Sequence, residues 1–162
     1  MHKTVYLSLG SNLGEREHHL QAAIERLRDL GEVTAVSSVY ETEPVDLAAQ
    51  PWFLNCAVQL ETELMPKQLL ARLQEIERDM GRRRTQKKGP RTLDIDILLF
   101  GHSVIDTPAL VVPHPALHER RFVLEPLAEI APETRHPVFK RTLRELCDAA
   151  TRVPGQTVKR VR

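Results

Sequence analysis

Two aspartates one residue apart, Asp94 and Asp96, are the residues of this sequence best suited to do chemistry. They begin an apolar, β-branched run, Asp94–Phe100, that follows a Gly-Pro turn and is typical of a buried strand. Side chains alternate along a strand, so both carboxylates point the same way, with Cα atoms roughly 7 Å apart. Such a pair repels at neutral pH and needs arginines or one or two hard divalent cations beside it. We expect Leu98 and Phe100 to continue the same face into apolar core.

A basic stretch without acids lies immediately before the two aspartates. It contains six cationic side chains, Arg82, Arg83, Arg84, Lys87, Lys88 and Arg91. An isolated Asp-x-Asp is more often a solvated strand start. Here the basic stretch suits a polyanion and the paired carboxylates suit a divalent metal. The two belong together, because a metal bridges phosphate oxygens to the protein while cations neutralise the charge that develops during transfer. The pattern therefore favours phosphoryl transfer without a Walker loop.

The bulk composition is that of an ordinary globular domain. The 162 residues carry a net charge of +1, with 41% hydrophobic and 28% charged side chains, which predicts one domain over residues 1–162. A charge this small excludes a nucleic-acid footprint over the whole protein, so any basic function is local. Cys56 and Cys147 lack metal-ligand spacing and are expected to be buried thiols. The sequence offers no apolar leader or membrane segment, and we expect a cytoplasmic protein.

The elements that must hold the aspartates form a recognisable order. Apolar periodicity predicts strand, helix, strand, strand, helix, strand, with Ser11 and Asn12 capping the first helix and Pro66 opening the second. The four strands are expected at Lys3–Leu9, Val33–Tyr40, Leu54–Thr62 and Asp94–Phe100. This order predicts an α+β fold with a ferredoxin-like split βαβ core, an antiparallel sheet with two helices on one face.

The remaining third of the chain is predicted to form a C-terminal helical extension. A short strand is expected at His102–Ile105, and helices at Val123–Ala128, disturbed by Pro126, and at Thr142–Ala149. Thr151–Arg162 is basic and is expected to be weakly structured.

Several motifs are spread over most of the chain. The most specific is Gly89–Gly101; the supporting motifs are Gly10–Leu13, Phe53–Asn55, Gly81-Arg82, Val112–Pro115 and Arg120–Phe122. Together they give a resemblance to the 6-hydroxymethyl-7,8-dihydropterin pyrophosphokinases of the folate pathway, which runs from about residue 4 to about residue 150. It implies transfer of the β,γ-diphosphate of ATP to the hydroxymethyl group of a reduced pterin, with release of AMP.

The resemblance also implies a role for individual residues. Asp94 and Asp96 look like ligands of two magnesium ions, and with Arg82 and Arg91 they form the implied catalytic set. The residues implied for the nucleotide are Gln74, Glu77, Arg82, Arg84, Arg91, Ile97, His114 and Arg120. Those implied for the pterin are Thr42, Val45, Phe53, Asn55, Asp94 and Phe122, with the phenylalanines stacking on the flat ring.

Some of these residues have plainer explanations. Gln74 and Glu77 fit the edge of a buried helical stripe equally well, and a phenylalanine or a lone histidine is usually structural. The sequence also departs from the family in the basic loop, with Lys88 where a tryptophan is common; Glu43 replaces a common proline and Pro115 a common aromatic. We expect Arg82–Lys88 to close over bound ATP as a lid.

Two rival functions are weaker. An RNA-binding module of this fold needs exposed aromatic side chains on its strands, which the sequence scarcely offers. A regulatory small-molecule-binding domain leaves the arginine cluster beside paired acids unexplained. The expected partners are therefore the small-molecule substrates alone, with no nucleic acid, no membrane and a monomeric state.

Overall fold

The computed structural model describes residues 2–43, 50–81, 92–153 and 155–161. Its centre is a six-stranded antiparallel sheet in the order β5-β1-β4-β3-β8, with β2 also pairing with β4. The strands are β1 (Lys3–Ser11), β2 (Glu32–Val36), β3 (Tyr40–Thr42), β4 (Phe53–Thr62), β5 (Asp94–Phe100) and β8 (Val158–Arg160). The apolar, buried β1 lies between β4 and β5, so residues far apart in sequence meet across it.

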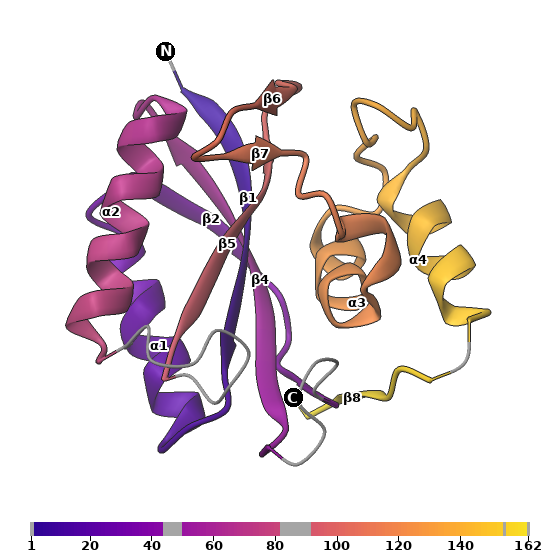
Figure 1. Cartoon of the computed structure of the whole chain (residues 1–162), viewed down its shortest axis with the longest axis horizontal. Coiled ribbons are helices and arrows are strands. Elements are labelled where there is room, and N and C mark those ends of the chain that lie inside the picture. Colours follow the sequence, from indigo (N-terminus) through magenta and orange to yellow (C-terminus); the bar gives the residue numbers. More distant parts are fainter. Residues whose placement is uncertain (1, 44–49, 82–91, 154, 162) are drawn as a thin grey trace.

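Two helices cover one face of the sheet, as Figure 1 shows: α1 (Arg16–Leu27) and α2 (Pro66–Asp79). Each has an apolar stripe at helical spacing that packs on the strands. The stripes are Leu20, Ala23, Ile24 and Leu27 on α1 and Leu69, Leu73 and Ile76 on α2. They join inward-facing strand residues such as Leu7 and Leu60 in one hydrophobic cluster, as the periodicity predicts.

The opposite face is covered by the C-terminal part of the chain. Helices α3 (Arg121–Ile130) and α4 (Leu143–Thr151), with a 3-10 turn at Leu117–Glu119, form a second cluster with Tyr6, Ala57 and Leu98 of the sheet (Figure 1). Pro126 is buried inside α3, which runs on past it instead of ending there. The sheet therefore lies between two layers of helices.

The expected position of Phe100 is wrong. Asp94 and Asp96 share a face with Leu98, but Phe100 lies in the cluster under α1 and α2. The register between β1 and β5 shifts, since Tyr6 pairs with Leu99 and Leu7 with Ile97, which leaves Leu98 as an extra residue. A bulge of this kind moves the following side chains to the other face.

The expected strand Val33–Tyr40 is two strands, β2 and β3, separated by residues 37–39. The Ser37 hydroxyl accepts the N–H of Ala57 at 2.8 Å and donates to the Ser38 carbonyl. The N–H and the hydroxyl of Ser38 both donate to Glu129 on α3. These side-chain bonds replace part of the strand ladder, as serine does near strand ends.

Two other expectations also need correction. The strand expected at His102–Ile105 is the hairpin of β6 (Ile105–Asp106) with β7 (Val111–Val112). The expected loose tail contains β8, which pairs with β3 along Tyr40–Thr42. An edge strand with unpaired main-chain groups is a template for such pairing, and tail composition alone does not reveal it.

The cysteines lie as predicted: Cys56 and Cys147 are free and buried. Burial raises the pKa of each thiol to about 12. Within the described ranges, no helix has the length and apolar character needed to cross a membrane.

A carboxylate near the end of α3 ties this helix to the sheet. Glu129 accepts hydrogen bonds from the Tyr40 hydroxyl at 2.6 Å and from the Ser38 N–H at 2.9 Å. Burial opposes ionisation of this carboxyl, but the bonds from Tyr40 and Ser38 outweigh it and hold the pKa of Glu129 below its ordinary value. Its ionised form therefore stabilises the fold above the unfolded pKa, and this contribution is lost as the pH falls through the folded pKa.

We predict that Tyr40→Phe lowers the free energy of unfolding by about 1 kcal/mol near neutral pH, because Glu129 loses a strong donor. The difference should shrink in acid, since a protonated Glu129 gains little from the tyrosine. Urea unfolding at about pH 7 and about pH 3.5 measures both values. Tyr6→Phe is the matched control, because Tyr6 is also 8% exposed and its hydroxyl lies 3.5 Å from Thr134. Equal losses in both variants at both pH values would contradict the prediction.

Candidate active site

A row of residues crosses three neighbouring strands at one end of the sheet. Gly10 of β1 pairs with Asn55 on β4 and with Asp94 on β5. A Cβ on Gly10 would lie 2.6 Å from Oδ1 of Asn55, so the glycine leaves the space into which this side chain leans. Asn55 is buried and its Nδ2 donates to Oγ1 of Thr42 on β3, which is also buried. Four strands thus bring Thr42, Asn55, Gly10 and Asp94 together.

The two aspartates lie on the sheet face that α3 and α4 cover. Asp94 and Asp96 are half-buried and alternate with Ile95 and Ile97, which are buried under α1 and α2. Two carboxylates on one face supply the oxygen ligands that Mg²⁺ prefers. Among the described residues, no group of three or more His, Cys, Asp or Glu side chains could hold a metal. A magnesium ion here would complete its shell with water and phosphate oxygens, which is its usual habit, so the residues fit it.

A third carboxylate fixes the strand between the aspartates. Glu77 of α2 is 6% exposed, and its Oε2 accepts the main-chain N–H of Ile95 at 2.8 Å. Because β5 is an edge strand, this N–H needs an acceptor from outside the sheet. Gln74 lies one turn earlier on α2 and is half-buried. The sequence left both residues open between the edge of the apolar stripe and the nucleotide role that the family resemblance implies, and it did not show the contact of Glu77 with β5.

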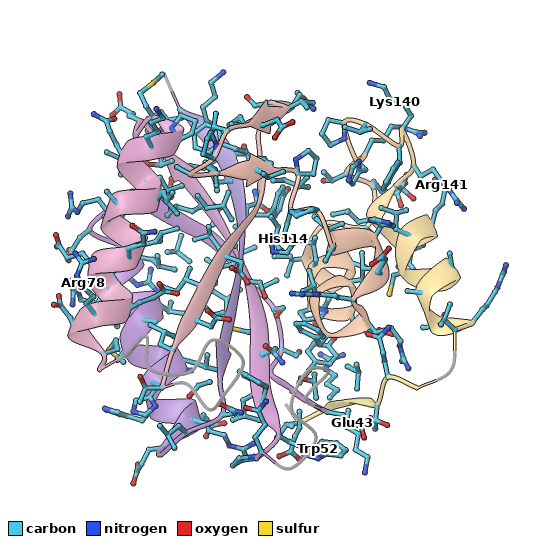
Figure 2. All side chains as sticks on the ribbon, in the orientation of Figure 1. Glu43, Trp52, Arg78, His114, Lys140 and Arg141 are labelled. Carbon is cyan, nitrogen blue, oxygen red and sulfur yellow. The ribbon has the colours of Figure 1, made fainter. Side chains whose placement is uncertain are left out.

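His114 is held beside β5 in a defined orientation, following the cis peptide bond between Val112 and Pro113. Its N–H donates to the Leu98 carbonyl at 3.0 Å, and its Nδ1 accepts the Ala116 N–H at 3.2 Å. The neutral ring therefore carries its proton on Nε2. Figure 2 shows the side chain between the sheet and α3.

The electrostatics of His114 favour its neutral form. Burial lowers the pKa of this imidazole, Arg120 lowers it further, and Asp94 acts in the opposite direction. The charges of Arg120 and Asp94 both act on the His114 ring, so these three predicted residues lie in the same region of the structure.

The two candidate aromatic side chains come from different layers. Phe53 begins β4, pairs with Thr42 and lies within 3.4 Å of the position that a Cβ of Gly10 would take. Phe122 lies in the first turn of α3, which packs against β4. The Arg120 guanidinium is 5.5 Å from the centre of the Phe122 ring, a cation–π distance. Both rings are half-buried, which leaves part of each accessible to a ligand.

The side chain of one predicted site residue, Ile97, lies on the other face of the sheet. Ile97 is 4% exposed in the cluster under α1 and α2, so its side chain points away from the aspartates. Val45, Arg82, Arg84 and Arg91, and the expected lid Arg82–Lys88, lie outside the described residues.

The role expected of Ser11 and Asn12 as helix caps is wrong, and Ser11 is the last residue of β1. The residue before α1 is Glu15, and Nδ2 of Asn12 instead donates to Oε1 of Gln50 at 2.8 Å and to the Pro51 carbonyl at 2.9 Å. Asn12 is 1% exposed, so these bonds fix the segment that leads into Phe53. The Gly10–Leu13 motif signalled the residue but not its partners.

Comparison with known proteins shows which family and which relatives this chain is similar to. Residues 6–132 match the family model described as 7,8-dihydro-6-hydroxymethylpterin-pyrophosphokinase (HPPK). The 2-amino-4-hydroxy-6-hydroxymethyldihydropteridine pyrophosphokinase of Bacillus subtilis is 50% identical over 132 residues, 80% of this chain and 79% of that protein. The protein of the same name from Pseudomonas aeruginosa is 48% identical over 139 residues, 85% of this chain and 86% of its own length. The Schizosaccharomyces pombe folic acid synthesis protein fol1 is 40% identical over 97% of this chain, which spans 21% of it.

Solved structures share the fold at much lower identity. The crystal structure of wild-type Plasmodium falciparum HPPK-DHPS with pterin and p-hydroxybenzoate has a TM-score of 0.74 and 18% identity; the match covers 92% of this chain and 42% of that one. At this identity the likeness extends to the fold alone. The family match and the bacterial relatives go further, and they show that this chain belongs to the 7,8-dihydro-6-hydroxymethylpterin-pyrophosphokinase family.

Proposed function

We propose that this protein transfers diphosphate from ATP to the hydroxymethyl group of 6-hydroxymethyl-7,8-dihydropterin, giving AMP and the pterin diphosphate ester for folate biosynthesis. The observation that carries the proposal is the row in which Asn55 and Asp94 flank Gly10 on one sheet face. These two residues are two strands apart, about 10 Å. A bicyclic ring held at Asn55 would therefore direct its substituent towards the carboxylates.

The pterin end is assigned to Thr42, Val45, Phe53, Asn55 and Phe122. Because Nδ2 of Asn55 is bound to Thr42, its Oδ1 is the atom left to accept from a ring N–H. A buried polar group oriented in this way discriminates strongly against rings that lack the complementary donor. Phe53 and Phe122 supply apolar faces for stacking on a flat heterocycle.

The nucleotide end is assigned to the carboxylates and the cations around them. Asp94 and Asp96 would hold the two expected magnesium ions, with Asp94 also next to the pterin hydroxymethyl group. When bound, these ions supply charge neutralisation and in-line alignment of the phosphates. The chain's own donors would be Nε2–H of His114 and the catalytic cations Arg82 and Arg91. The assisting residues are Arg84, Arg120, Gln74, Glu77 and Ile97, the last through its main chain.

The wider expectations belong to the same proposal. The order β5-β1-β4-β2 with α1 and α2 on one face supports a ferredoxin-like split βαβ core, to which α3 and α4 form a C-terminal helical extension. We infer one domain over residues 1–162, acting in the cytoplasm as a monomer on small molecules and without nucleic acid.

Asp94→Asn and Asp96→Asn should each lower turnover by roughly 10³-fold, several kcal/mol of barrier, because a metal ligand is lost. Thermal unfolding should stay within a few degrees of the parent, since removing one of two repelling charges does not destabilise the fold. AMP formation, dependent on both pterin and Mg²⁺, is the assay. Asp106→Asn on exposed β6 is the control. Near-normal turnover of either variant at low Mg²⁺ would refute the site.

Arg82→Ala and Arg91→Ala should slow the single-turnover rate by roughly 10²- to 10³-fold while weakening nucleotide binding much less, because cations that act on the transition state lower the rate more than ground-state affinity. Calorimetry with a non-hydrolysable ATP analogue, beside rapid quench, separates the two effects. Arg78→Ala, at an exposed position of α2 (Figure 2), is the matched control. If nucleotide affinity is lost while the single-turnover rate at saturating nucleotide is unchanged, both arginines only bind the nucleotide and do not act on the transition state.

Glu77→Leu should raise the Mg²⁺ concentration needed for half-maximal activity by about tenfold, because Ile95 loses its acceptor and the aspartates lose their spacing. Glu77→Gln keeps a carbonyl acceptor and should stay close to the parent. Hydrogen exchange at the Ile95 amide should accelerate in the leucine variant alone. Glu75→Leu, exposed on the same helix, is the control. Identical behaviour of the leucine and glutamine variants would show that charge, and not the bond to Ile95, is what matters.

A further inference from the structure

The start of α3 is capped from a distant part of the chain. The residue before the helix is Arg120, and within the described residues its side chain makes no cap bond. A helix start leaves main-chain N–H groups that need acceptors. Oε1 of Gln156 accepts the Arg121 N–H at 2.8 Å, although Gln156 lies 35 residues further along the sequence. The C-terminal segment thus does what a local cap residue normally does.

Gln156 makes further bonds to the same place. Its Nε2 donates to the Glu119 carbonyl at 2.9 Å, and its own carbonyl accepts from Nη1 of Arg121 at 2.9 Å. Nη2 of Arg121 donates to Glu125 at 3.1 Å, so both terminal nitrogens of the guanidinium are hydrogen-bonded. Gly155 precedes this contact with a φ of +104°, a conformation that favours glycine and turns the chain.

The same segment continues along the opposite side of the site. The main-chain carbonyl of Thr157 accepts the Glu43 N–H at 3.1 Å. Strand β8 then pairs with β3, where Val158 lies opposite Thr42. The Val161 N–H donates to the Val39 carbonyl at 2.7 Å and closes the ladder. Residues 156–161 therefore contact both α3, which carries Phe122, and β3, which carries Thr42.

We propose that residues 156–161 position the two flanks of the pterin pocket, and that Gln156 is the residue through which they set Phe122 and Arg120. The proposal rests on the proposed function for the identity of the substrate. It adds a segment that lies beyond the residues matching the family model, 6–132.

The physical argument concerns the cost of ordering the first turn of α3. Phe122 and Arg120 lie on either side of Arg121, whose N–H and side chain Gln156 holds. Without these bonds the first turn frays, and a substrate that needs Phe122 in place must order it on binding. Affinity falls by the fraction of time the turn is unformed, whereas the rate from the assembled complex does not change.

Matched variants at Gln156 test this proposal in the full chain. Gln156→Met keeps the length of the side chain and removes its hydrogen bonds. Gln156→Glu keeps the acceptor for Arg121 and adds a negative charge that suits a helix start. Lys159→Met, at an exposed position of β8, is the control for a change in the tail itself.

For Gln156→Met we expect the pterin KM to rise about tenfold, which is 1.4 kcal/mol. The ATP KM should change less and kcat at saturating pterin should remain close to the parent value. Amide exchange over residues 121–124 should accelerate. Gln156→Glu should keep a pterin KM within about threefold of the parent, because the cap on Arg121 survives.

Two results would overturn the proposal. One is a Gln156→Met variant with native pterin KM and native exchange at residues 121–124. The other is a lowered unfolding temperature with unchanged KM, which is the signature of a structural role alone. If the unmodified chain forms no AMP, the proposed function fails, and the exchange over residues 121–124 still decides whether Gln156 caps α3.

Discussion

The missing side chain at Gly10 is the constraint on which the site depends. Gly10 lies near the end of the interior strand β1, between Asn55 and Asp94, where any Cβ would meet Oδ1 of Asn55 at 2.6 Å. The space it leaves allows a buried amide to lean across β1 while bonded to Thr42 on the far side. A buried polar side chain is stable only when it is hydrogen-bonded, and Thr42 of β3 supplies the acceptor for Nδ2 of Asn55. The sheet therefore positions Thr42, Asn55 and Asp94 relative to one another.

The second requirement is that the edge strand carrying the aspartates be closed on its outer side. Open edges expose unpaired main-chain groups. Here Glu77 takes the Ile95 N–H, and the Leu98 carbonyl accepts the His114 N–H. Both closing residues are among those assigned to the nucleotide. The residues that stabilise the edge of β5 therefore overlap with the residues proposed for the nucleotide.

Much of the fold followed from periodicity, and the exceptions have specific causes. The stripes of α1 and α2 and the alternation of Asp94 and Asp96 are local patterns, which a sequence shows directly. The predicted position of Phe100 is wrong because the bulge in β5 depends on its pairing with β1, and no local sequence pattern encodes that pairing. The bonds of Asn12 and Gln156 join residues 38 and 35 positions apart. Candidate residues could therefore be named from sequence motifs, whereas their partners required the folded chain.

The pairing of β8 with β3 also decides how the two chain ends relate to the site. Lys3 begins β1 opposite Thr62, at the far end of the strand from Gly10. The last described residues instead run beside Val39–Thr42, and Figure 1 shows the start of β1 and the strand β8 at opposite ends of the sheet. A domain or affinity tag joined ahead of β1 starts far from the substrate residues. One joined after β8 starts beside Val39 and Tyr40, and Tyr40 lies opposite Asn55, so its linker and bulk bear on access to the pterin end of the site.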